Sequence, residues 1–120
     1  MPAKAGDVAQ RLDRSAFEAV NGSGRPIACT AQIAHWFSFP VGRAAPGGAV
    51  RSELLSDPST GTVFIDNGAG DLLPVEALWC GFEGRAWETR HVVLLARRLG
   101  EAPRDVAVTC MPGDDRLRCR

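Results

Sequence analysis

Four cysteines are spread along the 120 residues of this chain, and they constrain its fold more than any other feature. They are Cys29, Cys80, Cys110 and Cys119, and no two of them form a Cys-x-x-Cys pair. Zinc sites and dithiol redox sites usually take two sulfurs from one turn of the chain, so the spacing favours neither. Scattered cysteines in a small domain are typical of two disulfides, which form in the periplasm, at the cell surface or outside the cell.

The pairing of the cysteines stays open at this point, because four cysteines allow three connectivities. Cys110 and Cys119 flank a Pro-Gly-Asp-Asp turn, so a hairpin would bring them together. We therefore expect the disulfides Cys110–Cys119 and Cys29–Cys80. In the loop-entropy model the second link closes about 50 residues and stabilises the fold by roughly 3–4 kcal/mol. The alternative hypothesis is that these cysteines bind a metal or take part in redox exchange.

Charge and hydropathy argue against several classes of protein. The chain has 14 Lys+Arg and 14 Asp+Glu, so it lacks the basic excess of most nucleic-acid binders. No apolar run approaches the roughly 20 residues that cross a bilayer. The first residues lack the basic and apolar pattern of a signal peptide, so for an exported protein we expect the signal peptide to have been removed.

The first segment has the periodicity of an amphipathic helix. Apolar residues recur at helical spacing from Val8 to Val20, and Asp7 before them is a good N-cap. The Asn-Gly-Ser-Gly run at residues 21–24 would end this helix. The sequence therefore predicts a helix and linker over residues 1–24, packed on an antiparallel β domain over residues 25–120.

From residue 25 onward the period of the apolar residues falls to two, as in half-buried strands. A helix over Val92–Leu99 is the competing prediction to the strand Trp87–Leu95. The Asn67-Gly68 pair predicts a two-residue hairpin with positive φ at Gly68. About seven strands with tight turns predict an antiparallel β-sandwich or small barrel. The predicted strands are Ile27–Phe39 (stopped by Pro40), Ala49–Leu55, Thr62–Ile65, Leu72–Phe82, Trp87–Leu95, Asp105–Met111 and Leu117–Cys119.

The histidines and serines form no catalytic pattern. His35 and His91 both fall on the apolar phase of predicted strands, which is typical of half-buried histidines bonded within a sheet. As a general base or a metal pair they would instead indicate a small hydrolase or isomerase, or a periplasmic copper or zinc protein. No serine lies in Gly-x-Ser-x-Gly or Ser-x-x-Lys. We therefore expect no enzymatic activity, no cofactor and no metal, with these two classes as the alternative.

A binding surface is the remaining functional hypothesis. Trp36 lies on the polar face of its predicted strand, where a large flat ring is suited to a protein contact. The nearby loop, with Arg43, Gly47 and Gly48, would form the edge of that contact. The expected function is a non-enzymatic periplasmic or secreted module that binds a protein partner, such as an inhibitor, an immunity protein or a subunit of an envelope complex. The sequence does not indicate an oligomeric state.

Overall fold

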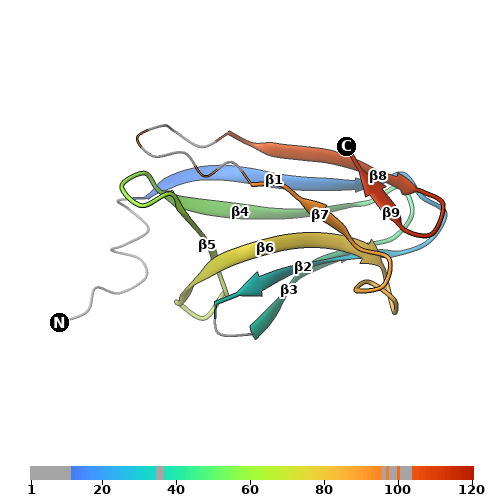
Figure 1. Ribbon diagram of the computed structural model, residues 1–120, viewed down its shortest axis with the longest axis horizontal. Coiled ribbons are helices and arrows are strands. Elements are labelled where there is room, and N and C mark those ends of the chain that lie inside the picture. Colours follow the sequence, from blue (N-terminus) through green and yellow to red (C-terminus); the bar gives the residue numbers. More distant parts are fainter. Residues whose placement is uncertain (1–11, 35–36, 96, 98–99, 101–103) are drawn as a thin grey trace.

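The computed structural model describes residues 12–34, 37–95, 97, 100 and 104–120. These residues form a mainly β fold with no helix, and thus no helix that could span a membrane. Nine strands make one sheet (Figure 1), which confirms the mainly β class. The strands are β1 (Asp13–Asn21), β2 (Ile27–Ile33), β3 (Phe37–Ala44), β4 (Ala49–Asp57), β5 (Thr62–Asp66), β6 (Leu72–Phe82), β7 (His91–Val93), β8 (Val106–Pro112) and β9 (Leu117–Cys119).

The strand order along the sheet is β3-β2-β6-β5-β4-β1-β8-β9, and β7 pairs with β6. Neighbouring strands are antiparallel, except that β1 and β8 run parallel, which the sequence did not predict. The sheet bends through β5, so that β1, β4 and β8 lie over β2, β3 and β6 (Figure 1). In the described part of the chain the sheet stays open and does not close into a barrel.

One apolar core lies between the two halves of the bent sheet. Alternate residues of β2 are buried, as period-two patterning requires, and the residues between them are half-buried. The same alternation in β1 buries Phe17 and Ala19 completely. Burial of this apolar surface is the main favourable term in folding. The core residues of the other strands include Val50, Leu54, Val63, Ile65, Val75, Leu78, Val93 and Leu117.

The two disulfides lie in this core and use all four cysteines. Cys29–Cys80 joins directly paired residues of β2 and β6, and Cys110–Cys119 joins directly paired residues of β8 and β9. Both expected pairings are confirmed. The Sγ atoms of Cys80, Cys110 and Cys119 lie within 4.8 Å of one another, so the disulfides of the two halves meet.

The predicted N-terminal helix is wrong for residues 13–20, which belong to β1; its first residues, from Asp7, lie partly outside the described residues. β1 pairs with both β4 and β8 and is therefore an inner strand of the sheet. Its period of two is hidden in the sequence because Ser15 and Asn21, two of its inward residues, are polar. The buried Asn21 amide donates to the Arg25 and Ala44 carbonyls at 2.7 and 3.0 Å, which satisfies it inside the core.

The predicted single strand Ile27–Phe39 is a hairpin instead. The chain reverses between β2 and β3, and Ile33 pairs with Phe37. Pro40 does not stop a strand but lies within β3, where it pairs with Thr30. β3 is an edge strand, so a residue without an N–H is tolerated there. The alternation continues in the sequence through residues 34–36, which contain no Gly or Pro, so the sequence did not indicate a reversal between β2 and β3.

The turn between β5 and β6 confirms one prediction and corrects another. Gly68 has φ 80°, as expected, but Asp66 pairs with Leu72, so residues 67–71 form a longer loop than a two-residue hairpin. The Asn67 side chain accepts hydrogen bonds from the backbone N–H groups of Ala69 and Asp71, at 2.8 and 3.2 Å. The side-chain oxygen of Asn67 thus organises this loop.

The segment predicted as a strand over Trp87–Leu95 is a strand only at His91–Val93. Val92 and Val93 belong to β7, so the competing helix over Val92–Leu99 is wrong at its start. Residues 83–90 form a turn between β6 and β7. The sequence predicted a longer strand because Trp87 and Thr89 continue the period of two of β7 into this turn.

Candidate protein-binding face

The residues predicted to bind a partner are distributed over separate places. Trp36 and His35 lie outside the described residues. Arg43 is exposed on β3, and its guanidinium forms an ion pair with Glu83 of the 83–90 turn, at 2.9 Å. Of the predicted residues, Arg43 is therefore the one that the structure joins to this turn.

Gly47 and Gly48 lie in the turn between β3 and β4 and are bound to the end of β1. The N–H of Gly47 donates to the Asn21 carbonyl at 2.9 Å, and the Gly48 carbonyl accepts from the Asn21 N–H at 2.8 Å. Gly47 has φ 83°, which favours glycine. These contacts give both glycines a role in the fold.

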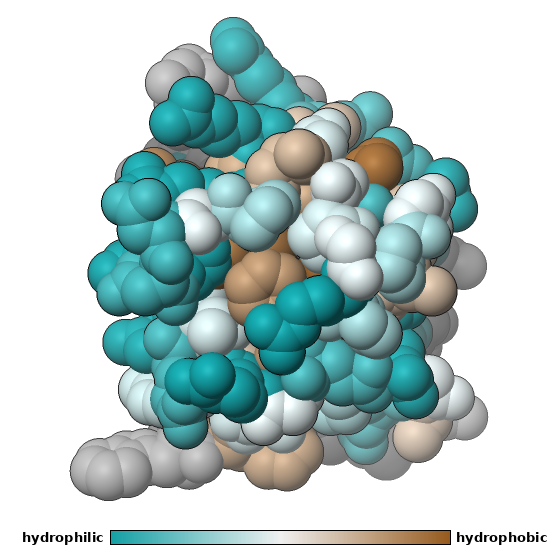
Figure 2. Space-filling view, turned by 90° about the vertical axis from the view of Figure 1, so that its right-hand side faces the viewer, coloured by the Kyte–Doolittle hydropathy of each residue, from teal (hydrophilic) through white to brown (hydrophobic). Residues whose placement is uncertain are grey.

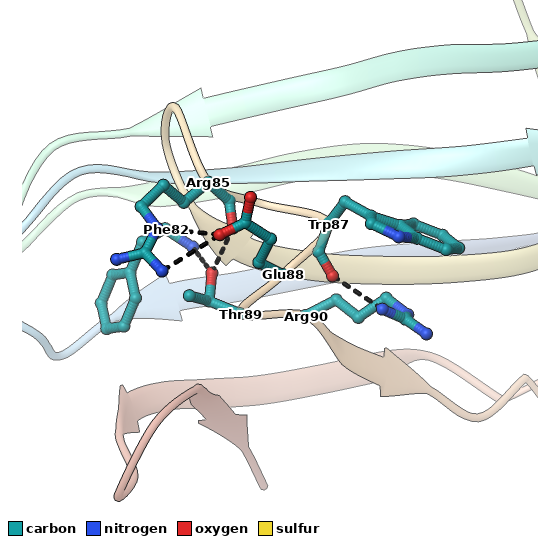
Figure 3. Close-up of polar contacts among 6 residues, drawn as sticks. All are labelled: Phe82, Arg85, Trp87, Glu88, Thr89 and Arg90. Carbon is teal, nitrogen blue, oxygen red and sulfur yellow. Dashed lines mark hydrogen bonds and ion pairs between the residues drawn. The ribbon is translucent and has the colours of Figure 1, made fainter.

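The 83–90 turn is fixed to the end of β6 by the buried Thr89 (Figure 3). The Thr89 hydroxyl accepts from the Phe82 N–H at 2.9 Å and donates to the Arg85 carbonyl at 2.7 Å. The Thr89 carbonyl also accepts from the Leu117 N–H of β9, at 2.8 Å. One threonine thus links the turn, β6 and β9.

Gly81 allows the turn to lie directly against β6. A Cβ atom at Gly81 would lie 2.2 Å from the carbonyl oxygen of Ala86, which is far inside van der Waals contact. Because the clash is with backbone, a side-chain rotation could not relieve it. A glycine is therefore required where the turn crosses the strand.

This turn presents an exposed tryptophan in a defined orientation. The Trp87 side chain is 59% exposed, and its ring packs edge-on against the buried Trp79, with centroids 5.4 Å apart. The Arg90 guanidinium lies 3.8 Å from the centroid of the Trp87 ring and donates to the Trp87 carbonyl at 2.7 Å (Figure 3). Such a cation–π contact at an exposed site is worth about 0.5–1 kcal/mol.

Trp87 is one of three tryptophans that the sequence offers as candidates, but the alternation of residues placed it in a strand, so neither Trp87 nor Arg90 was predicted to be a surface residue of a turn. The signal in the sequence was the Glu-Gly-Arg run at residues 83–85, which predicts a turn after β6. It indicates only the beginning of the turn over residues 83–90. The contact of Gly81 with Ala86 could not have been found in the sequence, since it depends on how the turn folds back.

Positive charge gathers beside Trp87. Arg116, Arg118 and Arg120 alternate with the buried Leu117 and Cys119, so all three arginines are exposed. An open cavity of about 370 Å³ lies next to Arg116, whereas Arg118 and Arg120 line a separate hollow with Met111. The space-filling view of this end shows polar residues around a small apolar area (Figure 2). The cavity is lined by Glu88, Arg90, His91, Val92 and Arg116.

We call Trp87, Arg90, His91, Val92 and Arg116 the Trp–Arg face. Burial lowers the pKa of His91 from its usual 6.5, and the positive charges of Arg118, Arg116 and Arg120 lower it further. His91 therefore carries less positive charge at pH 7 than an ordinary histidine, and the arginines supply most of the positive charge of this face. The carboxylate of Glu88, which also lines the cavity, is held by Arg85 at 3.0 Å.

A scan against protein-family models found no match for this chain, and a search of curated protein sequences also found none.

Gly81→Ala should destabilise the protein by about 1–3 kcal/mol, because the added methyl group forces the turn away from β6. Chemical denaturation measures the change. Gly24→Ala is the matched control, since nothing lies within 4 Å of its Cβ position, and its effect should stay within about 0.5 kcal/mol. Equal stability of the two variants would contradict the close contact of the turn with β6.

His91 should titrate below pH 6.5 in an NMR titration, and Arg118→Gln should move its pKa toward 6.5 by removing one repelling charge. The unfolded chain binds the proton first, so the stability falls as the pH decreases from 6.5 to the folded pKa and is unaffected above 6.5. A pKa at or above 6.5, or one that does not respond to Arg118→Gln, would contradict the described surroundings of His91.

Proposed function

We propose that the protein is a non-enzymatic binding module of the periplasm or the cell exterior, which binds an acidic protein surface through the Trp–Arg face. The observation that carries the proposal is the state of Trp87: it is 59% exposed, yet its ring is contacted by both Trp79 and Arg90. Folding gains little from an exposed ring held in this way, whereas a partner gains a rigid apolar anchor.

The composition of the face supports a protein partner. Trp and Arg are enriched among the residues that carry most of the binding energy in protein interfaces. Val92, which is 47% exposed, and Leu94, which is 86% exposed, extend the apolar area along the chain from β7. Because the turn is fixed by Thr89 and Gly81, binding would order few side chains and would lose little conformational entropy.

The charge of the face supports an acidic partner. The whole chain has no net charge, so the clustering of Arg90 and Arg116 in the face, with Arg118 and Arg120 beyond it, is local. Arg116 also pairs with Asp115 at 3.4 Å, so Arg90 is the main positive charge beside Trp87. Complementary charge increases the rate of association and excludes partners of like sign, and it makes binding sensitive to salt. A cluster of Asp and Glu around an apolar pocket for Trp87 is the surface that would fit.

The cysteines support an oxidising compartment. All four are joined in disulfides within the core, and such bonds persist in oxidising compartments. Roles as an inhibitor, an immunity protein or a subunit of an envelope complex are compatible with this compartment and a binding function. Arg43 would lie at the border of the contact through its pair with Glu83, and Trp36, Gly47 and Gly48 remain proposals from the sequence.

Photocrosslinking in the native host tests the proposal. A photoreactive amino acid placed at Val92 should crosslink one defined protein, while the same residue at the exposed Arg51 of β4 should not. With that partner purified, Trp87→Ala and Arg90→Glu should each weaken binding by about tenfold or more, and the affinity should fall as salt rises.

Arg51→Glu is the matched control for the charge change and should bind normally. Equal crosslinking at Val92 and Arg51, or unchanged affinity of Trp87→Ala with an intact fold, would contradict this function.

A further inference from the structure

The sulfur atoms of the two disulfides meet in the core. Cys80 belongs to one disulfide and Cys110 and Cys119 to the other, yet their three Sγ atoms lie within 4.8 Å of one another. Thiol–disulfide exchange needs a thiolate close to a disulfide sulfur, and here the fold already supplies that proximity. A thiol set free in one disulfide would therefore face a sulfur of the other without rearrangement of the sheet.

The two disulfides differ in their access to an outside reagent. Cys29, Cys80 and Cys110 are at most 1% exposed, whereas Cys119 is 5% exposed. Cys119 also ends β9, a strand of three residues at the edge of the sheet. A short edge strand has few backbone hydrogen bonds and opens more readily than an inner strand, so a reductant reaches the Cys110–Cys119 bond first.

Thiolate formation activates the outer cysteines, Cys110 and Cys119, because the thiolate is the species that attacks a disulfide. Arg118 and Arg120 flank Cys119 in the chain, but their side chains are exposed on the face of β9 opposite the buried Cys119. The exchange therefore rests on the proximity of the sulfurs and not on charge. We call Cys29–Cys80 the inner disulfide and Cys110–Cys119 the outer one. The inner disulfide joins β2 and β6 in the core, where the neighbouring cysteines that could supply a thiolate are those of the outer disulfide.

We propose that the four cysteines form a thiol–disulfide exchange site, which accepts two electrons from an external dithiol at Cys110–Cys119 and passes them to Cys29–Cys80. One thiolate of the dithiol attacks Cys119 and breaks its bond to Cys110. The second thiolate displaces Cys119, so the dithiol leaves as a disulfide and the protein gains two thiols.

The transfer to the inner disulfide then takes two exchanges. The Cys119 thiolate attacks Cys80, which forms a Cys80–Cys119 bond and releases Cys29 with the electron pair. The Cys110 thiolate next attacks Cys119, which restores Cys110–Cys119 and releases Cys80. Each exchange breaks one S–S bond and forms one, and the two protons of the dithiol end on Cys29 and Cys80.

Single-cysteine variants test the exchange directly. Cys110→Ser leaves a free Cys119 beside the inner disulfide. After incubation at about pH 8, where cysteines ionise, the sample is quenched with acid, unfolded, alkylated and digested with trypsin without reduction. Mass spectrometry should find Cys29 alkylated in about a tenth of the molecules or more, each with a Cys80–Cys119 linkage.

Cys29→Ser provides a second, independent variant, because it leaves Cys80 free beside the outer disulfide and should yield Cys80 linked to Cys110 or Cys119. Cys80→Ser is the matched control: it frees Cys29, which lies outside the cluster of three close sulfurs, and Cys110–Cys119 should stay intact. Circular dichroism checks that each variant is folded.

Wild-type protein given one equivalent of dithiothreitol covers the case in which the variants do not fold, and it should show the same Cys80 linkages among partly reduced molecules. Native pairings alone in every folded variant and in the partly reduced wild type would overturn the proposal. Intact partner binding by the Trp–Arg face in these samples would leave the proposed function unaffected, so the two ideas fail separately.

Discussion

The contact between the two disulfides is the point on which the rest of the structure depends. Cys80 lies in the half of the sheet formed by β2, β3, β6 and β7, and its sulfur meets Cys110 and Cys119 of the β8–β9 hairpin. The Cys29–Cys80 disulfide joins residues 51 positions apart in the chain, and the Cys110–Cys119 disulfide joins residues 9 positions apart. In the loop-entropy model they stabilise the fold by about 4 and about 2–3 kcal/mol, and together they fix the register of both strand pairs at the centre of the core.

The surface features follow from that fixed centre. β6 is held by the inner disulfide at Cys80, and the next residue, Gly81, lets the 83–90 turn fold back on the strand. Thr89 then binds the turn to Phe82 and to Leu117 of β9, which precedes Cys119 by two residues. Trp87 and Arg90 owe their orientation to this chain of contacts. An exposed tryptophan on a loop is ordinary, whereas one supported from the core in this way is suited to recognition.

The sequence predicted the parts of this fold that depend on local chemistry. Cys110–Cys119, the bounds of β6 and β9, and the positive φ of Gly68 could be predicted because short hairpins, period-two patterning and Asn-Gly turns act locally, and Cys29–Cys80 followed as the remaining pair. β1 was missed because the polar Ser15 and Asn21 face inward, and Asn21 is acceptable there only because distant carbonyls satisfy its amide. The Trp–Arg face was missed for a similar reason, since the contact of Gly81 with Ala86 exists only in the folded turn.

A non-reducing peptide map of the native protein tests the central claim most directly. Trypsin can cut between all four cysteines, because Arg43, Arg51, Arg104, Arg116 and Arg118 separate them. The structure predicts two linked peptide pairs, one with Cys29 and Cys80 and the other with Cys110 and Cys119, and no alkylated thiol. A Cys29–Cys110 or Cys29–Cys119 link as the main product, or four alkylated thiols, would contradict the account of a β fold centred on two adjoining disulfides.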